Sequence, residues 1–304
     1  MKLSFKSTPL QPLHDDLFDE LGLKVFIKRL DKMHSHISGN KWFKLKYNLQ
    51  EAEAKGHDSI LTFGGAYSNH IAATAAVGKI NKIKTIGIIR GEETLPFNPV
   101  LKFAKKNGME LFYLNREQYR LKNTDEIIRE LENRFDKFYL IPEGGANVLG
   151  VKGCTEIIDD IGIDFDYIFS ECGTGTTLAG LSLSLKNHQL ALGIPVLKGA
   201  QFLEQDIIRL MTDYKLEFGE MNDASDHINK FKLIYDYHFG GYAKSTDELD
   251  LFIAEFIKKH GVIIEPVYSG KLFFALFDMA KNNYFKPNSK IVLLHTGGTS
   301  FVNQ

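Results

Sequence analysis

One stretch constrains the fold of this chain more than any other, Asp166–Leu185, with the sequence DYIFSECGTGTTLAGLSLSL. Tyr167–Ser170 is apolar and aromatic between acidic residues, which predicts a short buried strand. The small, glycine-rich residues Cys172–Thr177 suit a tight turn, and the leucines and small residues that follow predict a helix packed against a sheet. The stretch is therefore typical of a strand, a tight turn and a helix in an α/β fold.

The glycine-rich turn has the chemistry of a phosphate site. A helix that begins directly after such a turn points its unpaired N–H groups, and the positive end of its dipole, at the turn. Gly173 and Gly175 let a ligand approach the backbone closely, and hydroxyl donors are supplied by Thr174, Thr176 and Thr177. The turn is thus shaped for a small anion, and an ordinary turn without a ligand is the alternative.

The same turn lacks both common nucleotide-binding patterns. Leu178 occupies the position of the third glycine in G-x-G-x-x-G, and the lysine of a P-loop is absent. We therefore expect the turn to hold a small terminal phosphate rather than a dinucleotide or a triphosphate. A nicotinamide dehydrogenase is disfavoured for the same reason.

Strands and helices alternate along the rest of the chain. After an extended entry at Thr8–Leu13 and a strand at Lys24–Arg29, an amphipathic helix is predicted to end at Gly56. Four strands separated by helices then predict a small parallel layer, at residues 59–63, 85–89, 110–114 and 138–141. The second half predicts strands at 167–170, 196–199, 232–237 and 291–294, and helices at 151–161, 203–214, 247–260 and from the PVYSGK turn to about 282.

These elements predict an α/β fold of two open, mostly parallel layers, with a ligand in the cleft between them. The glycine- and proline-rich segment Ile141–Gly150 is expected to form the exit from the first layer. Residues 48–150 are therefore predicted to be a small domain inserted into a large domain of residues 1–47 and 151–304.

Charge and cysteine content restrict the possible partners. A net charge of -1 in 304 residues gives no electrostatic reason for binding nucleic acid or a membrane surface. Charged residues interrupt the apolar runs before membrane-spanning length, and Met1–Pro12 lacks the apolar core of a secretory signal. The only cysteines, Cys154 and Cys172, suit a reducing compartment, and their spacing suits no metal site. We expect a cytoplasmic protein without a metal.

Lys41 is a candidate nucleophile. It follows a Gly-Asn turn and precedes the apolar residues Trp42 and Phe43, so its amine can lose part of its hydration. Loss of hydration lowers the pKa of an amine and makes it nucleophilic. An ordinary surface lysine is the alternative for this residue taken alone.

A second polar turn, Gly64–His70, follows a predicted strand and opens a helix. Its Ser68, Asn69 and His70 suit an anion the size of a carboxylate, although helix capping alone explains either Ser68 or Asn69. A phosphate site, an amine nucleophile and a carboxylate site together suit an amino-acid substrate and the cofactor pyridoxal phosphate (PLP).

Eight segments spread over almost the whole chain resemble the characteristic segments of one enzyme family, in the same order: STPLQPL, KVFIKR, SGNKWFKL, GGAYSNH, CGTGTTLAG, GGY, PVYSGK and HTGG. In these segments the chain resembles the 1-aminocyclopropane-1-carboxylate deaminase / D-cysteine desulfhydrase family, which belongs to the fold-type-II PLP enzymes, the tryptophan synthase β-like group. The resemblance implies two αβα layers with the active site between them, a PLP-dependent lyase of small amino acids, and a homodimer.

The resemblance also implies roles for individual residues. Lys41, in the family's GGNK block, binds the cofactor covalently and moves the proton; Ser38 replaces the first glycine of that block. Ser68, Asn69 and His70 hold the substrate carboxylate. Asn69 also donates a hydrogen bond to the ring oxygen of the cofactor.

The remaining implied residues surround the cofactor. Its phosphate lies on Gly173–Thr177, its pyridine face lies against Tyr268, and Tyr242 is a second active-site tyrosine. A core tyrosine is the alternative for Tyr268, since aromatic residues in apolar turns are usually buried for packing. Thr296 and Gly297 of the HTGG segment close the edge of the ring.

One departure from the family pattern bears on the substrate. The deaminase branch has PVYEGK, whose acid contacts the pyridine nitrogen, whereas this chain has Ser269. A hydroxyl bonds a neutral ring nitrogen but does not stabilise a protonated one, so the ring is a weaker electron sink. We therefore expect β-elimination from D-cysteine to pyruvate, ammonia and sulfide. The alternatives are deamination of 1-aminocyclopropane-1-carboxylate to 2-oxobutyrate and ammonia, and a PLP-binding protein with little turnover.

Overall fold

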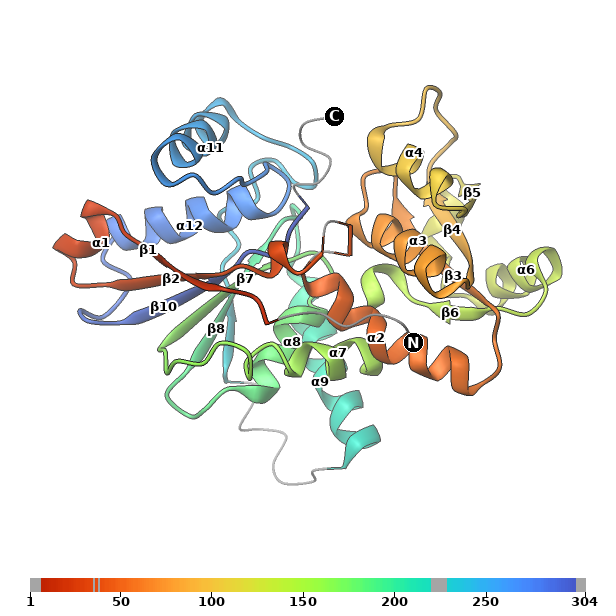
Figure 1. The fold of residues 1–304 in the computed structure, drawn as a ribbon, viewed down its shortest axis with the longest axis horizontal. Coiled ribbons are helices and arrows are strands. Elements are labelled where there is room, and N and C mark those ends of the chain that lie inside the picture. Colours follow the sequence, from red (N-terminus) through yellow and green to blue (C-terminus); the bar gives the residue numbers. More distant parts are fainter. Residues whose placement is uncertain (1–6, 35, 38, 220–228, 299–304) are drawn as a thin grey trace.

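Two β-sheets, each covered by helices, organise the structure. The computed structural model describes residues 7–34, 36–37, 39–219 and 229–298, so Ser38 lies outside the described residues. Figure 1 shows the larger sheet on the left and the smaller sheet on the right, with helix α2 (Asn40–Ala54) running between them. The predicted α/β fold of two mostly parallel layers is confirmed.

The larger sheet combines strands from both ends of the chain: β1 (Leu10–Leu13), β2 (Lys24–Lys28), β7 (Tyr167–Cys172), β8 (Leu190–Pro195), β9 (Phe231–Leu233) and β10 (Lys290–Leu294). Their order is β1-β2-β10-β7-β8-β9, and only β1 runs antiparallel to its neighbour. In β10, Ile291 and Leu293 face one helical layer while Val292 and Leu294 face the other, because side chains alternate along a strand.

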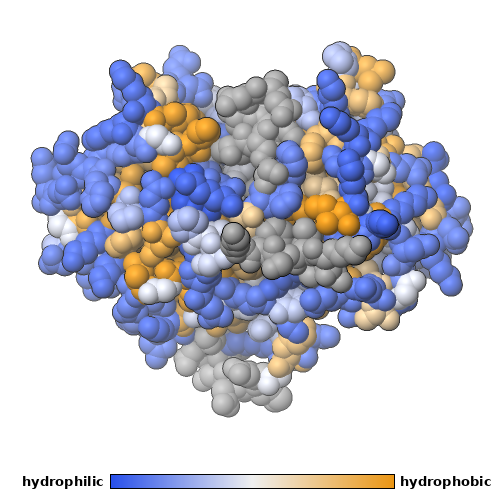
Figure 2. Space-filling view, viewed as in Figure 1, coloured by the Kyte–Doolittle hydropathy of each residue, from blue (hydrophilic) through white to orange (hydrophobic). Residues whose placement is uncertain are grey.

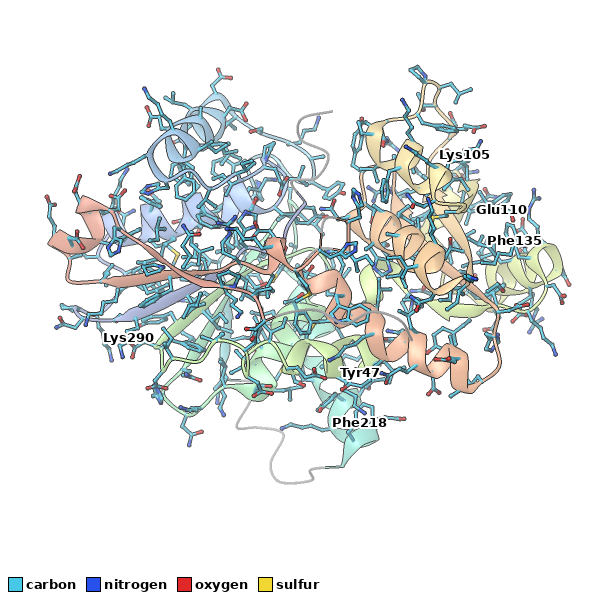
Figure 3. All side chains as sticks on the ribbon, in the orientation of Figure 1. Tyr47, Lys105, Glu110, Phe135, Phe218 and Lys290 are labelled. Atoms are coloured by element: carbon cyan, nitrogen blue, oxygen red, sulfur yellow. The ribbon has the colours of Figure 1, made fainter. Side chains whose placement is uncertain are left out.

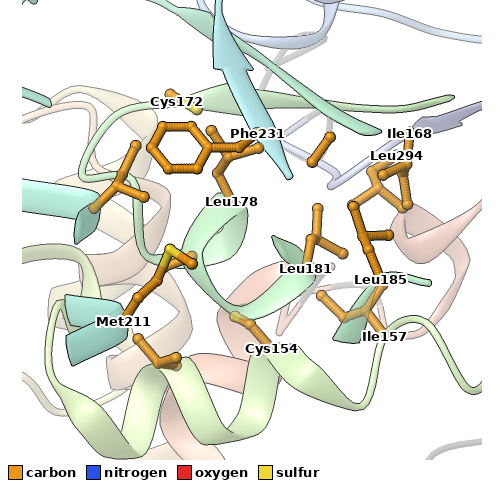
Figure 4. Packing of buried hydrophobic residues seen from close by; sticks show 14 of the residues in the cluster. Cys154, Ile157, Ile168, Cys172, Leu178, Leu181, Leu185, Met211, Phe231 and Leu294 are labelled. Carbon is orange, nitrogen blue, oxygen red and sulfur yellow. The ribbon is translucent and has the colours of Figure 1, made fainter. Parts of the chain in front are cut away.

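Helices cover both faces of this sheet. One layer contains α7 (Val148–Thr155), α8 (Thr176–Ser184) and α9 (Phe202–Phe218); the other contains α1 (Asp16–Glu20), α11 (Asp247–His260) and α12 (Ser269–Lys281). Figure 4 shows the first layer, in which Leu178 and Leu181 of α8 share one apolar core with Cys154 and Met211 of the neighbouring helices. This core fixes α8, and with it the glycine-rich turn, at the carboxyl end of β7.

The smaller sheet contains four parallel strands, β3 (Ser59–Gly65), β4 (Lys84–Arg90), β5 (Glu110–Leu114) and β6 (Tyr139–Ile141), in the order β5-β4-β3-β6. Its helices are α3 (Asn69–Asn81), α4 (Pro99–Lys106), α5 (Arg116–Arg120) and α6 (Asp125–Phe135). Figure 3 labels Glu110 and Phe135 on the outer side of this unit, and the ring of Phe135 lies edge-on to Phe112 at 5.8 Å between centroids. The predicted layer of four strands is confirmed.

Helix α2 belongs to both units. Trp42, Leu45 and Leu49 pack in a core with residues of the smaller unit, whereas Phe43 packs in the core of the larger one. The predicted domain boundary at residue 47 therefore falls inside a continuous helix. All strands of the smaller sheet lie within residues 48–150, and the assignment of two domains stays a prediction.

One predicted strand, at residues 196–199, is wrong. The strand that follows β7 in the chain and pairs with it is β8, which ends at Pro195. Gly193 and Pro195 resemble turn residues in the sequence, but Gly193 is required for close packing. A Cβ at this position would lie 2.5 Å from Cδ2 of Leu178 on α8 and 2.9 Å from Sγ of Cys172. The helix predicted over 151–161 also begins earlier, at Val148, and ends at Thr155.

The visible surface is mainly hydrophilic. Figure 2 shows apolar side chains in separate groups divided by hydrophilic ones. Within the described ranges, no helix has both the length and the apolar content that crossing a bilayer requires.

Candidate active site

A cavity of about 430 Å³ lies between the two units. Its walls include the carboxyl ends of β3, β4 and β7, contributed by Gly65, Arg90 and Glu171. In parallel α/β sheets, ligands bind at this edge of the strands. The cleft expected from the sequence is therefore present.

Most of the predicted site residues line this cavity: Lys41, Ser68, Asn69, His70, Gly173, Thr174, Gly175, Thr177, Tyr242 and Tyr268. Four others lie outside the lining, namely Thr176, Ser269, Thr296 and Gly297, and all four are buried. The structure thus brings together the amine, both polar turns and both tyrosines, which come from distant parts of the sequence. Their individual roles stay predictions.

Lys41 lies in the first turn of α2. Its Nζ donates a hydrogen bond to Oδ1 of Asn40 at 2.6 Å. The preceding Gly39 has a φ of 61°, and a Cβ at this position would lie 1.9 Å from the carbonyl oxygen of Thr296. Only glycine allows this close approach, which fixes the start of α2 against the end of β10.

The surroundings of Lys41 lower the pKa of its amine to about 7. The main cause is the loss of water around the amine, and the positive charge of Lys44 adds to it. The acidic side chains of Glu171 and Glu265 act in the opposite direction. An amine with this pKa is neutral in a large fraction of molecules near neutral pH, so it can act as a nucleophile and as a base.

The glycine-rich turn leads directly into α8. Gly175 is the N-cap residue of α8, with a φ of 74°, and as a glycine it supplies no capping side chain to the first turn of this helix. A Cβ on Gly175 would lie 2.4 Å from Cγ1 of Ile207 on α9, so this position requires glycine for both its conformation and its packing. The first-turn N–H groups are therefore available to an anion.

The second polar turn begins α3. Ser68 is its N-cap residue, and its Oγ accepts a hydrogen bond from Ile71 N at 3.4 Å, so the capping interpretation holds for this side chain. Nε2 of His70 lies 3.0 Å from Oγ1 of Thr62. Burial, with the charges of two nearby lysines, lowers the pKa of His70 to about 3. His70 is therefore neutral and can offer a hydrogen bond but no charge.

The two predicted tyrosines lie side by side. The ring centroids of Tyr242 and Tyr268 are 6.0 Å apart, at an interplanar angle of 72°. Nζ of Lys271 donates hydrogen bonds to the carbonyl oxygens of His238 and Gly241, at 2.9 and 2.8 Å. This buried lysine of α12 thus holds the loop that carries Tyr242.

Ser269 has partners within the chain. Its Oγ accepts a hydrogen bond from Glu265 N at 2.9 Å and lies 3.3 Å from Oε1 of Glu265. The Glu265 carboxylate in turn accepts hydrogen bonds from the N–H groups of Val267, Tyr268 and Ser269. The predicted contact between Ser269 and the cofactor stays a prediction, and the hydroxyl is already engaged in this turn.

Glu171 is one of several residues of the cavity that the sequence reasoning missed. It is buried at the end of β7, where its Oε1 accepts a hydrogen bond from Oγ1 of Thr296. Burial raises the pKa of Glu171 to about 7. The available signal was a carboxylate at the end of a buried strand, directly before a ligand-binding turn.

Comparison with known proteins agrees with this geometry. The family model for pyridoxal-phosphate dependent enzymes matches residues 1–297. A protein of Pyrococcus horikoshii named "Putative 1-aminocyclopropane-1-carboxylate deaminase" is 34% identical over 302 residues, which cover 96% of this chain and 90% of that protein. A mitochondrial bifunctional D-cysteine desulfhydrase/1-aminocyclopropane-1-carboxylate deaminase of Arabidopsis thaliana is 29% identical, over 91% of this chain and 73% of that protein.

A solved structure described as an ACC deaminase homologue superimposes on this fold with a TM-score of 0.85. It is 33% identical in sequence, and the match covers 98% of this chain and 91% of that one.

Proposed function

Because the chain belongs to the pyridoxal-phosphate-dependent enzyme family, in its 1-aminocyclopropane-1-carboxylate deaminase / D-cysteine desulfhydrase group, we propose that it deaminates a small α-amino acid. One observation carries the proposal. The Lys41 amine, with its lowered pKa, faces the same cavity as the first turn of α8 and the polar turn at Ser68. Cytoplasmic location and a homodimer remain predictions from the sequence.

The described residues fit the cofactor. The first turn of α8 has no capping side chain, so its N–H groups would suit the phosphate, and Lys41 would supply the amine for the aldehyde. The ring of Tyr268 lines the cavity next to Gly173, at 3.8 Å from the position of a Cβ there. When bound, PLP withdraws electrons from the α-carbon of the substrate and stabilises the negative charge that forms there.

Different residues of the chain then have different roles in the reaction. The neutral Lys41 amine accepts a proton at Nζ and returns it, which is general base and acid catalysis by one group. Ser68 and Asn69, at the start of α3, orient the substrate through its carboxylate. Lys41 and Glu171 both line the cavity, and the surrounding protein removes part of the water from the Lys41 amine.

We rank the cyclopropane substrate first, which reverses the expectation from the sequence. That expectation depended on Ser269 as a neutral partner for the ring, but the Ser269 hydroxyl is engaged with Glu265, and a carboxyl group, that of Glu171, lines the cavity. Two named relatives agree with this order: the Pyrococcus horikoshii protein named for cyclopropane deamination is 34% identical, and a D-cysteine desulfhydrase of Yersinia enterocolitica is 25% identical.

The first candidate reaction is 1-aminocyclopropane-1-carboxylate with water to 2-oxobutyrate and ammonia. The second is D-cysteine with water to pyruvate, ammonia and sulfide, which the name of the bifunctional Arabidopsis relative supports. In both reactions the substrate loses its amino group to water, and Lys41 serves as the base.

A substrate panel tests the proposal. The purified, PLP-loaded protein is incubated with each compound, and 2-oxobutyrate, pyruvate, sulfide and ammonia are measured, with Lys41→Ala as the control. We expect 2-oxobutyrate and ammonia from the cyclopropane substrate. Sulfide and pyruvate without 2-oxobutyrate would reverse the ranking. A loaded protein inert to both would favour a PLP-binding protein with little turnover.

A further inference from the structure

Glu171 is a buried carboxyl group, and one of its two oxygens forms no hydrogen bond with the described residues. Its Oε1 accepts a hydrogen bond from Thr296, which follows β10, the neighbour of β7 in the sheet. Its Oε2 is buried and has no hydrogen-bond partner in residues 7–34, 36–37, 39–219 and 229–298. A buried, unpaired carboxylate oxygen is costly unless a bound group or a proton satisfies it.

The position of Glu171 gives this oxygen a candidate partner. Glu171 and Lys41 line the same cavity, from β7 and from the first turn of α2. The Thr296 hydroxyl donates a hydrogen bond to Glu171, and the carbonyl oxygen of Thr296 lies against Gly39, so one residue contacts both sides of this arrangement.

We propose that Glu171 is a second acid–base group of the site, which exchanges one proton with the amine of Lys41. In the exchange an N–H bond of the Lys41 ammonium breaks and an O–H bond forms at Oε2 of Glu171. Both groups are then neutral, and no other reactant is needed. The inference rests on the proposed role of Lys41 but not on the choice of substrate.

The electrostatic surroundings support a shared proton. Burial lowers the pKa of Lys41 and raises that of Glu171, so that both are about 7. The negative charge of Glu171 stabilises the Lys41 ammonium, and the positive charge of Lys41 stabilises the Glu171 carboxylate. Such a pair titrates as a unit with two macroscopic steps. The other groups that act on Lys41 or Glu171 are Lys44 on α2, His70 on α3, Cys154 on α7, Cys172 on β7, and Glu265 and Tyr268 before α12.

The test measures the amine itself. The full-length protein without cofactor is acetylated at a series of pH values, and the rate at Lys41 is read by peptide mass spectrometry. Glu171→Gln removes the negative charge that favours the ammonium, so the titration midpoint of Lys41 falls. If it falls by about one pH unit, acetylation becomes about fivefold faster at one unit below the wild-type midpoint. An unchanged midpoint would overturn the proposal.

Matched variants separate this effect from a general disturbance. Glu143→Gln removes a carboxylate that also lines the cavity but pairs with Lys122 at 3.3 Å, and it should leave the midpoint unchanged. Thr296→Val removes the donor to Oε1 and favours protonated Glu171, so it should move the midpoint in the same direction as Glu171→Gln. This second variant decides the question if Glu171→Gln does not fold, and no movement in it counts against the shared proton.

If Glu143→Gln moved the midpoint as far as Glu171→Gln, the effect would be a general property of the cavity, and the pairing would be wrong. Failure of the proposed function would give a different experimental result. In that case the substrate panel gives no product, while the acetylation midpoints still report the pair.

Discussion

The side-chain amide of Asn40 donates a hydrogen bond to Oγ1 of Thr177 at 3.0 Å, although the two residues are 137 positions apart. Oδ1 of Asn40 also accepts a hydrogen bond from Nζ of Lys41 at 2.6 Å. One buried amide therefore connects the candidate nucleophile to the first turn of α8. The amine and the glycine-rich turn are linked by hydrogen bonds within the protein.

A double-mutant cycle on this bond tests the connection. Asn40→Ala and Thr177→Val each leave a buried polar group without its partner, which costs about 1–3 kcal/mol of unfolding free energy. The double variant should lose less than the sum of the single losses, by about 1 kcal/mol, because both partners are then absent. Urea unfolding measures all four proteins, and additive losses would show that the bond contributes nothing.

The identity of the nucleophile is tested by chemical labelling. The visible absorption of the PLP-loaded protein should disappear in Lys41→Ala, because this variant lacks the amine that we propose binds the PLP aldehyde. Turnover should fall by about 10²–10⁴-fold or more with the loss of the base. Borohydride reduction of the wild-type protein should label the peptide that contains Lys41. Lys44→Met is the matched control, since Lys44 lines the same cavity, and it should still be labelled at Lys41.

The strand, turn and helix at Asp166–Leu185 could be predicted because they depend on local residue pattern. The observed β7 and α8 lie within this range. β8 was misplaced because Gly193 is needed for contacts with Leu178 and Cys172, and local sequence cannot distinguish that need from a turn. The position of β8 therefore depends on packing between distant residues rather than on the local sequence.

In the candidate site, too, only the features that depend on local sequence could be predicted. Lys41, Ser68 and Gly173 could be predicted to line the cavity, since each lies in a recognisable turn or directly after one. The environment of Glu171 could not, because it depends on Thr296, which is 125 residues away and comes close only through the pairing of β10 with β7. The partner of Ser269 is only four residues away, yet its bond depends on the conformation of the turn before α12.

Gly175 should tolerate no side chain. In Gly175→Ala the positive φ costs about 1–2 kcal/mol, and the clash with Ile207 adds about 1–3 kcal/mol. The clash also displaces the turn, so PLP affinity should fall. Gly162→Ala is a close control, because Gly162 has the same φ of 74° with nothing within 4 Å of the added Cβ. It should show the backbone cost alone. Equal losses in the two variants, measured by urea unfolding, would mean that packing against Ile207 is unimportant.

The pH dependence of cofactor binding should depend on Lys44. Its positive charge lowers the pKa of Lys41, so Lys44→Met should raise that pKa above about 7. Covalent binding of the PLP aldehyde needs the neutral amine, and below its pKa the neutral fraction falls tenfold for each unit that the pKa rises. The rate at which visible absorption appears after PLP is added to the cofactor-free protein should therefore shift to higher pH. Lys46→Met is the control, since Lys46 lies on the same helix and its charge is paired with Glu156. A shift to lower pH in Lys44→Met, or an equal shift in both variants, would contradict the assignment of Lys44 as the charge that keeps Lys41 reactive.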